Sequence, residues 1–266
     1  TTSKVSAFDA RTGKKIWRNS VRPRGEDELV LGGGIAAIPE VLYVTNGFNE
    51  LLALSPQSGG IFWRVKLPSP SRAAPTVHNG RVFVVTLDNR LIAFNGQDGS
   101  LLWEYQALTE DTSLLGAASP AATDNIVVGA FSSGELTALN PETGAVMWSD
   151  DLAPSVRVGG LGALPDIQAL PVIDQGKVYG ISFGGRMMGF DEITGTRVWQ
   201  RDVNGSDTPW IAGNYMFVIT SSHELVALSR DTGVISWAKP LNGYFKLPEE
   251  ASKTVWGGPV LAGGPG

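Results

Sequence analysis

Side chains that could carry out chemistry are sparse in this chain of 266 residues. The two histidines, His78 and His223, could act as general bases or metal ligands, and the adjacent acids Asp150 and Asp151 could form a catalytic carboxylate pair. The glycine run 32–34 could wrap a phosphate group. Each kind of site has a further requirement: convergent ligands for a metal, a cleft for paired carboxylates, and a following helix for a phosphate loop.

The sequence around these residues favours turns and loops over reactive sites. Both histidines lie in short polar segments between apolar runs, so we expect solvated residues in corresponding turns of different repeats. The two aspartates follow a strand-like segment, where a solvated turn is expected, and a strand-like segment rather than a helix follows the glycine run. We therefore predict a protein that is not an enzyme, with no catalytic residue, no metal site and no bound cofactor.

Composition narrows the functional classes further. The absence of cysteine excludes a disulfide framework, a thiolate metal site, a cysteine nucleophile and covalently attached haem. The net charge is −5 and no basic stripe is visible, which argues against nucleic acid or an anionic membrane surface as a partner. No apolar stretch reaches the length of about 18 residues that a membrane-spanning helix needs.

One motif recurs along the chain: an apolar pair, a turn that ends in glycine, and then a tryptophan. Its six copies end at Trp17, Trp63, Trp103, Trp148, Trp199 and Trp237, which are 38 to 51 residues apart. A period of roughly 40–45 residues with one tryptophan per unit is typical of β-propeller blades. The segment 73–108 shows the unit most clearly, because it contains four strand-like runs separated by turn residues.

The predicted fold is therefore all-β: a β-propeller of four-stranded antiparallel blades, forming a single domain over residues 1–266. Five complete blades and two partial ones are expected: 35–67, 73–108, 118–152, 169–203 and 208–241, with partial blades at 1–18 and 256–266. A closed ring buries both faces of every blade, whereas an open arc exposes a sheet edge at each end. We expect the native chain to continue past Gly266, and a six-bladed ring that joins the two partial ends is the alternative.

The tryptophan of each motif is predicted to be structural. A tryptophan in the fourth strand can bury roughly 150–250 Å² between neighbouring blades while its indole N–H donates to a backbone carbonyl. The glycine that ends each turn can adopt the left-handed backbone conformation that the turn requires. This structural blade motif comprises all six tryptophans named above.

The motif L-x-A-L-x-x-x-T-G-x-x-x-W resembles the blade motif of the pyrroloquinoline-quinone (PQQ) dehydrogenase-like propellers, although the copy at 187–190 has glycine in place of the alanine. Within that superfamily the segments 114–120 and 164–179, together with the long spacing between Trp148 and Trp199, resemble the BamB family. Members of that family are lipoprotein subunits of the outer-membrane β-barrel assembly (BAM) complex. Because the family is eight-bladed, the resemblance implies that the chain is a fragment of an eight-bladed ring.

The resemblance implies a scaffold that binds the periplasmic POTRA domains of the barrel-forming subunit through two inter-blade loops, with unfolded outer-membrane clients as further partners. The family carries Leu-Arg in the first loop and Asp-x-Asp in the second. Leu114 and Asp166 match this pattern, whereas Leu115 replaces the arginine and Gln168 replaces the second acid. Losing the bidentate arginine shifts the expected contact toward apolar burial. The alternative is structural: the two leucines pack under their loop and Asp166 caps a turn.

The same resemblance implies a location at the periplasmic face of the outer membrane of a Gram-negative bacterium. A lipid anchor upstream of Thr1 would be the protein's means of membrane association. The alternative function is a relative of the PQQ-type quinoprotein dehydrogenases, or another ligand-binding propeller. Such dehydrogenases typically use a vicinal disulfide beside the cofactor, which a chain without cysteine cannot form.

Overall fold

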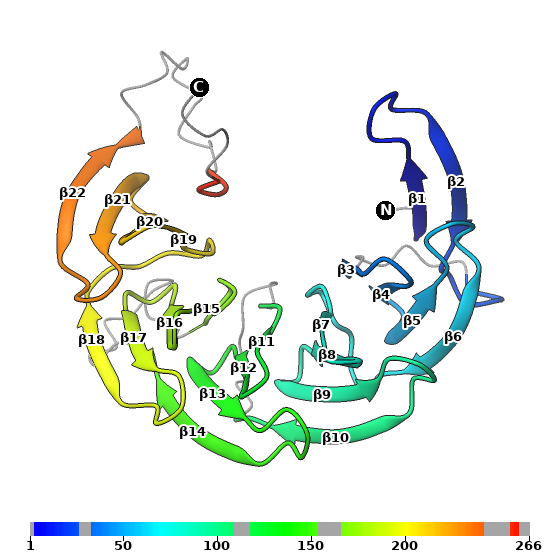
Figure 1. The fold of residues 1–266 in the computed structure, drawn as a ribbon, viewed down its shortest axis with the longest axis horizontal. Helices are drawn as coiled ribbons and strands as arrows, with labels where there is room; N and C mark the ends of the chain where they lie inside the picture. The colour runs from blue at the N-terminus through cyan, green and yellow to red at the C-terminus, as the bar shows by residue number, and fades with distance from the viewer. Residues whose placement is uncertain (1–2, 27–32, 109–117, 154–165, 242–255, 261–266) are drawn as a thin grey trace. The chain divides into compact units, whose positions relative to one another are not determined.

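The computed structural model describes residues 3–26, 33–108, 118–153, 166–241 and 256–260. These residues form five four-stranded sheets and one two-stranded sheet, and the strands of each sheet lie side by side in chain order (Figure 1). The prediction of an all-β fold built from four-stranded antiparallel blades is confirmed. Within the described ranges, no helix has the length and apolar character needed to cross a membrane.

The strands are short and follow one another closely. The two-stranded sheet consists of β1 (Lys4–Phe8) and β2 (Lys15–Ser20). The next sheets consist of β3 (Ile35–Ala37), β4 (Leu42–Asn46), β5 (Glu50–Leu54) and β6 (Ile61–Lys66), and of β7 (Thr76–His78), β8 (Arg81–Val85), β9 (Arg90–Asn95) and β10 (Leu101–Gln106). The third four-stranded sheet consists of β11 (Ala121–Ala122), β12 (Val127–Ala130), β13 (Glu135–Leu139) and β14 (Val146–Asp151). The last two consist of β15 (Val172–Asp174), β16 (Lys177–Ile181), β17 (Met187–Asp191) and β18 (Arg197–Arg201), and of β19 (Trp210–Ala212), β20 (Tyr215–Ile219), β21 (Glu224–Ser229) and β22 (Ile235–Pro240).

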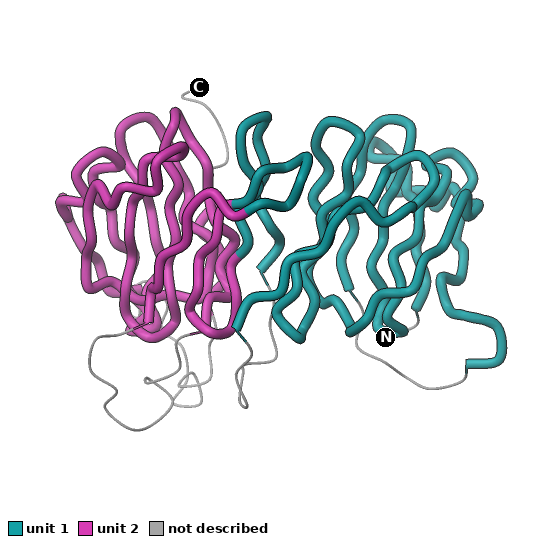
Figure 2. Tube along the Cα trace, turned by 90° about the horizontal axis from the view of Figure 1, so that it is seen from below, with its two compact units in different colours: residues 1–109, 115–129, 139–145 teal, residues 110–114, 130–138, 146–266 magenta. Residues whose placement is uncertain are grey.

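Contacts divide the chain into two compact units (Figure 2). Unit 1 comprises residues 1–109, 115–129 and 139–145, and unit 2 comprises residues 110–114, 130–138 and 146–266. The single domain expected from the sequence stays a prediction. Residues 256–260 form no strand, although the sequence predicts the first strand of a partial blade there. The remainder of that expected blade lies outside the described residues.

The middle strands of the sheets supply the core. All five residues of β5 are buried, and the apolar run of β9 is buried as well, as expected for strands covered on both faces. In unit 1 one core cluster combines Tyr43 and Leu51 from one sheet with Val82, Val84 and Ile92 from the next. In this unit the apolar core therefore lies between these two consecutive sheets, and each of them depends on the other for burial.

Five of the motif tryptophans join their sheet to the following sheet in the same way. Each indole N–H donates to a backbone carbonyl in the turn between the third and fourth strands of that following sheet. The Nε1–O distances are 2.8 Å for Trp17 to Pro56, 3.2 Å for Trp63 to Gly96, 3.1 Å for Trp103 to Pro141, 2.9 Å for Trp148 to Glu192 and 2.9 Å for Trp199 to Arg230. The first three bonds lie within unit 1 and the last two within unit 2. We call this arrangement the Trp–turn contact.

A glycine completes each Trp–turn contact. The glycine that ends the turn has φ between 65° and 74°, and a Cβ atom there would lie only 2.4–2.8 Å from the indole. The five glycines are Gly59, Gly99, Gly144, Gly195 and Gly233. Any other residue would be strained by the positive φ and would also collide with the ring, so the turn requires glycine for two independent reasons.

A β-bulge directly before the tryptophan aims the ring at the next sheet. In β10, Leu101 pairs with Phe94 and Trp103 pairs with Ala93, so Leu102 is the additional residue. The same register shift precedes Trp17, Trp63, Trp199 and Trp237. A bulge increases the local twist and redirects the side chain that follows it. It also interrupts the outer edge of the sheet, which discourages pairing with another strand.

We predict that Gly144→Ala lowers the free energy of unfolding by roughly 3 kcal/mol or more, because it adds backbone strain and a collision with Trp103. The matched control is Gly176→Ala. Gly176 has a similar φ of 75°, but a Cβ atom there meets nothing within 4 Å. The control should therefore cost only about 1–2 kcal/mol. Urea unfolding of both variants measures the difference, and equal losses would contradict the role given to the indole.

Candidate partner-binding site

Two of the four predicted partner-binding residues belong to the described structure. Leu114 and Leu115 lie outside the described residues. Asp166 and Gln168 lie in the segment 166–171, which leads into β15 of unit 2. The structure therefore gives the geometry of the second predicted loop only where that loop re-enters its sheet.

The segment 166–171 is fastened to two structural neighbours. The Ile167 N–H donates to the Phe131 carbonyl at 3.3 Å, and the Asp166 carbonyl accepts from the Phe183 N–H at 3.0 Å. The Asp166 residue is only 2% exposed, whereas Gln168 is partly exposed. Of the two predicted contacts, Gln168 is thus accessible to a partner, and Asp166 belongs to the packed base that positions the segment.

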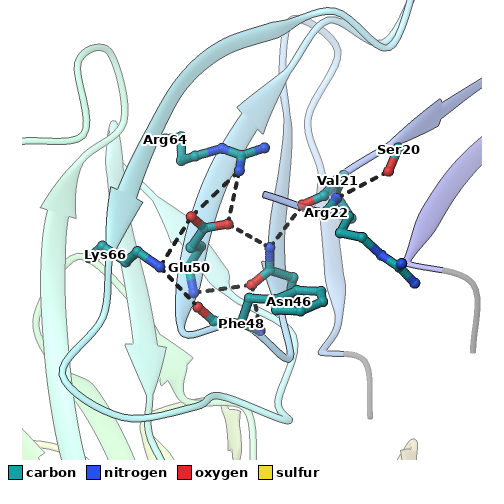
Figure 3. Close-up of polar contacts among 8 residues, drawn as sticks. All are labelled: Ser20, Val21, Arg22, Asn46, Phe48, Glu50, Arg64 and Lys66. Atoms are coloured by element: carbon teal, nitrogen blue, oxygen red, sulfur yellow. Dashed lines mark hydrogen bonds and ion pairs between the residues drawn. The ribbon is translucent and has the colours of Figure 1, made fainter. Parts of the chain in front are cut away.

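An enclosed carboxylate that forms ion pairs belongs to Glu50, the first residue of β5 in unit 1 (Figure 3). Its side chain is 3% exposed. Arg64 Nη1 lies 3.2 Å from one carboxylate oxygen, and Lys66 Nζ lies 3.5 Å from the other. The Asn46 side-chain N–H donates to the same oxygen as Arg64 at 2.9 Å and also to the Val21 carbonyl at 3.0 Å.

This network is structural in its chemistry. Both carboxylate oxygens of Glu50 are engaged by cations or an amide, so the group is poorly placed to accept a proton from a substrate. Through Asn46 it fixes the backbone at Val21, where the chain leaves β2. The network therefore anchors the two-stranded sheet to the following sheet. In the sequence, the available signal is a charged residue directly before the apolar run Leu51–Leu54.

The two histidines lie at different points of their sheets, which corrects the expectation of corresponding turns. His78 is the last residue of β7, and its Nε2 lies 2.7 Å from Asp124 Oδ1. The Asn79 side chain donates to the same oxygen at 2.6 Å. These hydrogen bonds hold the pKa of the Asp124 carboxyl below its usual value. His223 lies between β20 and β21 with φ of 61°.

The sequence predicts that Asp150 and Asp151 lie in a solvated turn, but the structure places them in a strand. Both belong to β14. Asp150 accepts two hydrogen bonds from the Arg197 guanidinium, at 2.7 and 2.9 Å, and so links β14 to β18 within unit 2. Asp150 is therefore engaged in joining sheets, whereas the exposed Asp151 accepts a hydrogen bond from the Ala153 N–H at 2.7 Å. Across the described ranges, no group of three or more histidine, cysteine or acidic residues is arranged to hold a metal ion.

The family comparison gives one match along most of the chain. A family profile described as "Outer membrane protein assembly factor BamB" matches residues 1–239. The protein of that name from Yersinia pestis is 25% identical over 240 residues, which cover 88% of this chain and 61% of that protein. The one from Nitrosomonas eutropha is 28% identical over 211 residues, covering 79% of this chain and 50% of that protein. An uncharacterized protein of Rickettsia conorii is 30% identical over 247 residues, covering 90% and 58%. The chain thus spans between half and about three-fifths of the length of these curated relatives.

Solved structures share the fold. The crystal structure of BamB from Moraxella catarrhalis superposes with a TM-score of 0.79 at 24% identity, covering 89% of this chain and 70% of that one. A europium-containing methanol dehydrogenase superposes with a TM-score of 0.64 at 16% identity, covering 79% and 51%. Both likenesses are to the fold, which assembly factors and dehydrogenases therefore have in common.

We predict that Glu50→Ala lowers the free energy of unfolding by roughly 3 kcal/mol or more, since it leaves Arg64 without its enclosed partner and removes one of the two acceptors of the Asn46 side-chain amide. Glu104→Ala is the matched control, because Glu104 pairs with Arg90 and both side chains are about one-third exposed. That change should cost less than about 1 kcal/mol. Denaturant unfolding at pH 7 compares the two variants. A Glu50 variant as stable as the control would refute the anchoring role.

Proposed function

The chain belongs to the family of the outer membrane protein assembly factor BamB, and from that membership we propose that it is a non-enzymatic scaffold for assembly of outer-membrane β-barrels. The partner would be the barrel-forming subunit of the assembly complex, bound through its periplasmic POTRA domains, and unfolded clients would be further partners. The place of action would be the periplasmic face of the outer membrane, with a lipid anchor in the full-length protein. The family match over residues 1–239 is the observation that carries this proposal.

The mechanism that we propose is docking by inter-blade loops on a rigid support. The Trp–turn contacts and the buried strands fix the sheets within each unit, so a loop that leaves a sheet starts from a defined point. Where the second predicted loop returns, the backbone hydrogen bonds at Asp166 and Ile167 hold its end in place. A loop with fixed ends loses less conformational freedom on binding, which favours affinity. Leu114, Leu115 and Gln168 are the proposed contact residues, and Asp166 is the proposed positioning residue.

Strand addition at the outer edge of a sheet is a less suitable mode of docking. The bulge before the tryptophan interrupts the hydrogen-bonding edge of the outer strands β6, β10 and β18. Pairing of an extended peptide along those strands would have to cross this irregularity. The bulges therefore support docking through loops over augmentation of the outer edges.

The dehydrogenase alternative draws only on the shared fold. The methanol dehydrogenase is 16% identical, and a fold of this kind supports many unrelated functions. This chain has no cysteine for a vicinal disulfide, and the enclosed carboxylate of Glu50 is already paired with two cations. The observations on the site residues therefore favour the scaffold.

The test is a binding measurement between the 266-residue chain and the purified periplasmic region of the barrel-forming subunit. We expect Leu114→Asp and Gln168→Ala each to weaken binding about tenfold or more, because each removes a proposed contact. Asp166 is left unchanged, since a substitution at a buried residue would alter the fold as well as the surface. Asp202→Asn, an exposed change in unit 2, is the matched control.

Unchanged binding of both loop variants would overturn the assignment of the loops. Absence of binding by the unaltered chain would overturn the proposed function itself. Unfolding curves recorded alongside check that each variant retains the stability of the unaltered chain.

A further inference from the structure

Because the chain is a repeat, the residue that begins each inter-blade connection can be compared with the residues at the equivalent position of the other repeats. Four residues after each of five motif tryptophans lies a buried apolar residue: Val21, Leu67, Ala107, Leu152 and Val203. The next position begins the connection to the following sheet. It holds Arg22, Pro68, Ala153 and Asn204 in four repeats, all polar, small or proline. In the repeat of Trp103 it holds a leucine, Leu108, which is 72% exposed.

The backbone at Leu108 is held by several hydrogen bonds. The Ala107 N–H donates to the Asn89 carbonyl at 2.9 Å, and the Asn89 side chain donates to the Leu108 carbonyl at 2.6 Å. The Gln106 side chain adds donations to the carbonyls of Asp88, at 2.8 Å, and Ala107, at 3.0 Å. A large apolar side chain is thus presented to solvent from a fixed backbone. An exposed residue that is already ordered loses little freedom when a partner covers it.

A second exception to the repeat lies in unit 2, at the position where an inter-blade connection ends and the first strand of a sheet begins. The first strands of four sheets are preceded by a buried proline, and the residue before that proline is Ala74, Ser119 or Thr208 in three of them. In the fourth it is Leu170, which is 41% exposed between the buried residues Ala169 and Pro171. Its N–H donates to the Thr208 hydroxyl at 3.1 Å, so this backbone is also fixed.

Both exceptions occur beside the connections that the sequence singles out for partner binding. Leu108 precedes the first of them, and Leu170 follows the second. Single exposed apolar residues are common on protein surfaces and carry no meaning alone. Here, however, the equivalent positions of the same molecule hold small or polar residues or a proline, and the sheets form with those residues in place. Stability therefore gives no reason for a leucine at either place.

We propose that Leu108 and Leu170 are two separate apolar contact points, one in each unit, for a folded protein partner that covers each side chain with an apolar depression. This inference rests on the proposed function, and the partner is the periplasmic region of the barrel-forming subunit. The apolar character agrees with the replacement of the family's arginine by Leu115, which already shifts the expected contact from charge pairing to burial.

The test replaces each leucine by the residue that another repeat carries at the same position. Leu108→Asn copies Asn204, and Leu170→Thr copies Thr208, so neither change should disturb the fold. The matched controls are Leu101→Thr in unit 1 and Ile193→Thr in unit 2, which alter side chains that are 59% and 50% exposed away from the two connections. Binding of each variant to the purified periplasmic region of the barrel-forming subunit is measured by calorimetry, with unfolding curves in parallel.

We expect Leu108→Asn and Leu170→Thr each to weaken binding about tenfold or more, since burial of a leucine side chain is lost, while the controls bind as the unaltered chain does. Unaltered binding of both leucine variants would overturn this inference and leave the proposed function standing. Equal weakening of the controls would also overturn it, because any exposed apolar residue would then serve. Absence of binding by the unaltered chain would remove the proposed function and this inference with it.

Discussion

The structure depends on the contact between a tryptophan ring and the glycine turn of the following sheet. A four-stranded sheet of short strands has two apolar faces and cannot bury them alone. The Trp–turn contact meets this requirement in one step: the ring covers the turn, and its N–H satisfies a carbonyl that would otherwise lie buried beside an apolar surface. The same geometry recurs from Trp17 to Trp199 with different sequences around it. Side-chain pairs such as Asp150–Arg197 add charge-assisted links between neighbouring sheets.

Because the Trp–turn contact is what joins neighbouring sheets, the residues of the connections between sheets are free to vary. Within each unit the described strands and turns follow the repeat, and two departures from it lie where the chain passes between a sheet and a connection. Leu108 and Leu170 are such departures, and neither is needed for packing. In the proposed function the sheets supply position and the connections supply the contacts, in keeping with the variety of functions that one fold can support.

Much of the fold could be predicted from the sequence because its determinants are local. The period of the tryptophans and the turn glycines identify the blades without any knowledge of contacts. The polar contacts could not be predicted, because their partners are distant along the chain. His78 meets Asp124, which is 46 residues away, and Asp150 meets Arg197, which is 47 residues away. The segment that begins at Asp166 is likewise held by backbone hydrogen bonds to Phe131 and Phe183, which no local pattern connects to it. In the sequence Glu50 resembles a solvated charge, and only the structure shows its contacts with Asn46 and Arg64.

A double-mutant cycle of Trp103→Leu and Gly144→Ala is the most direct test of the claim that the indole and the turn glycine form one unit. If they do, the alanine collides with the ring in the unaltered chain but meets much less resistance once the ring is gone. The effect of the double variant on the unfolding free energy is then expected to fall short of the sum of the two single losses by about 2 kcal/mol. Losses that add to within about 0.5 kcal/mol would contradict it, because the tryptophan and the glycine would then act independently.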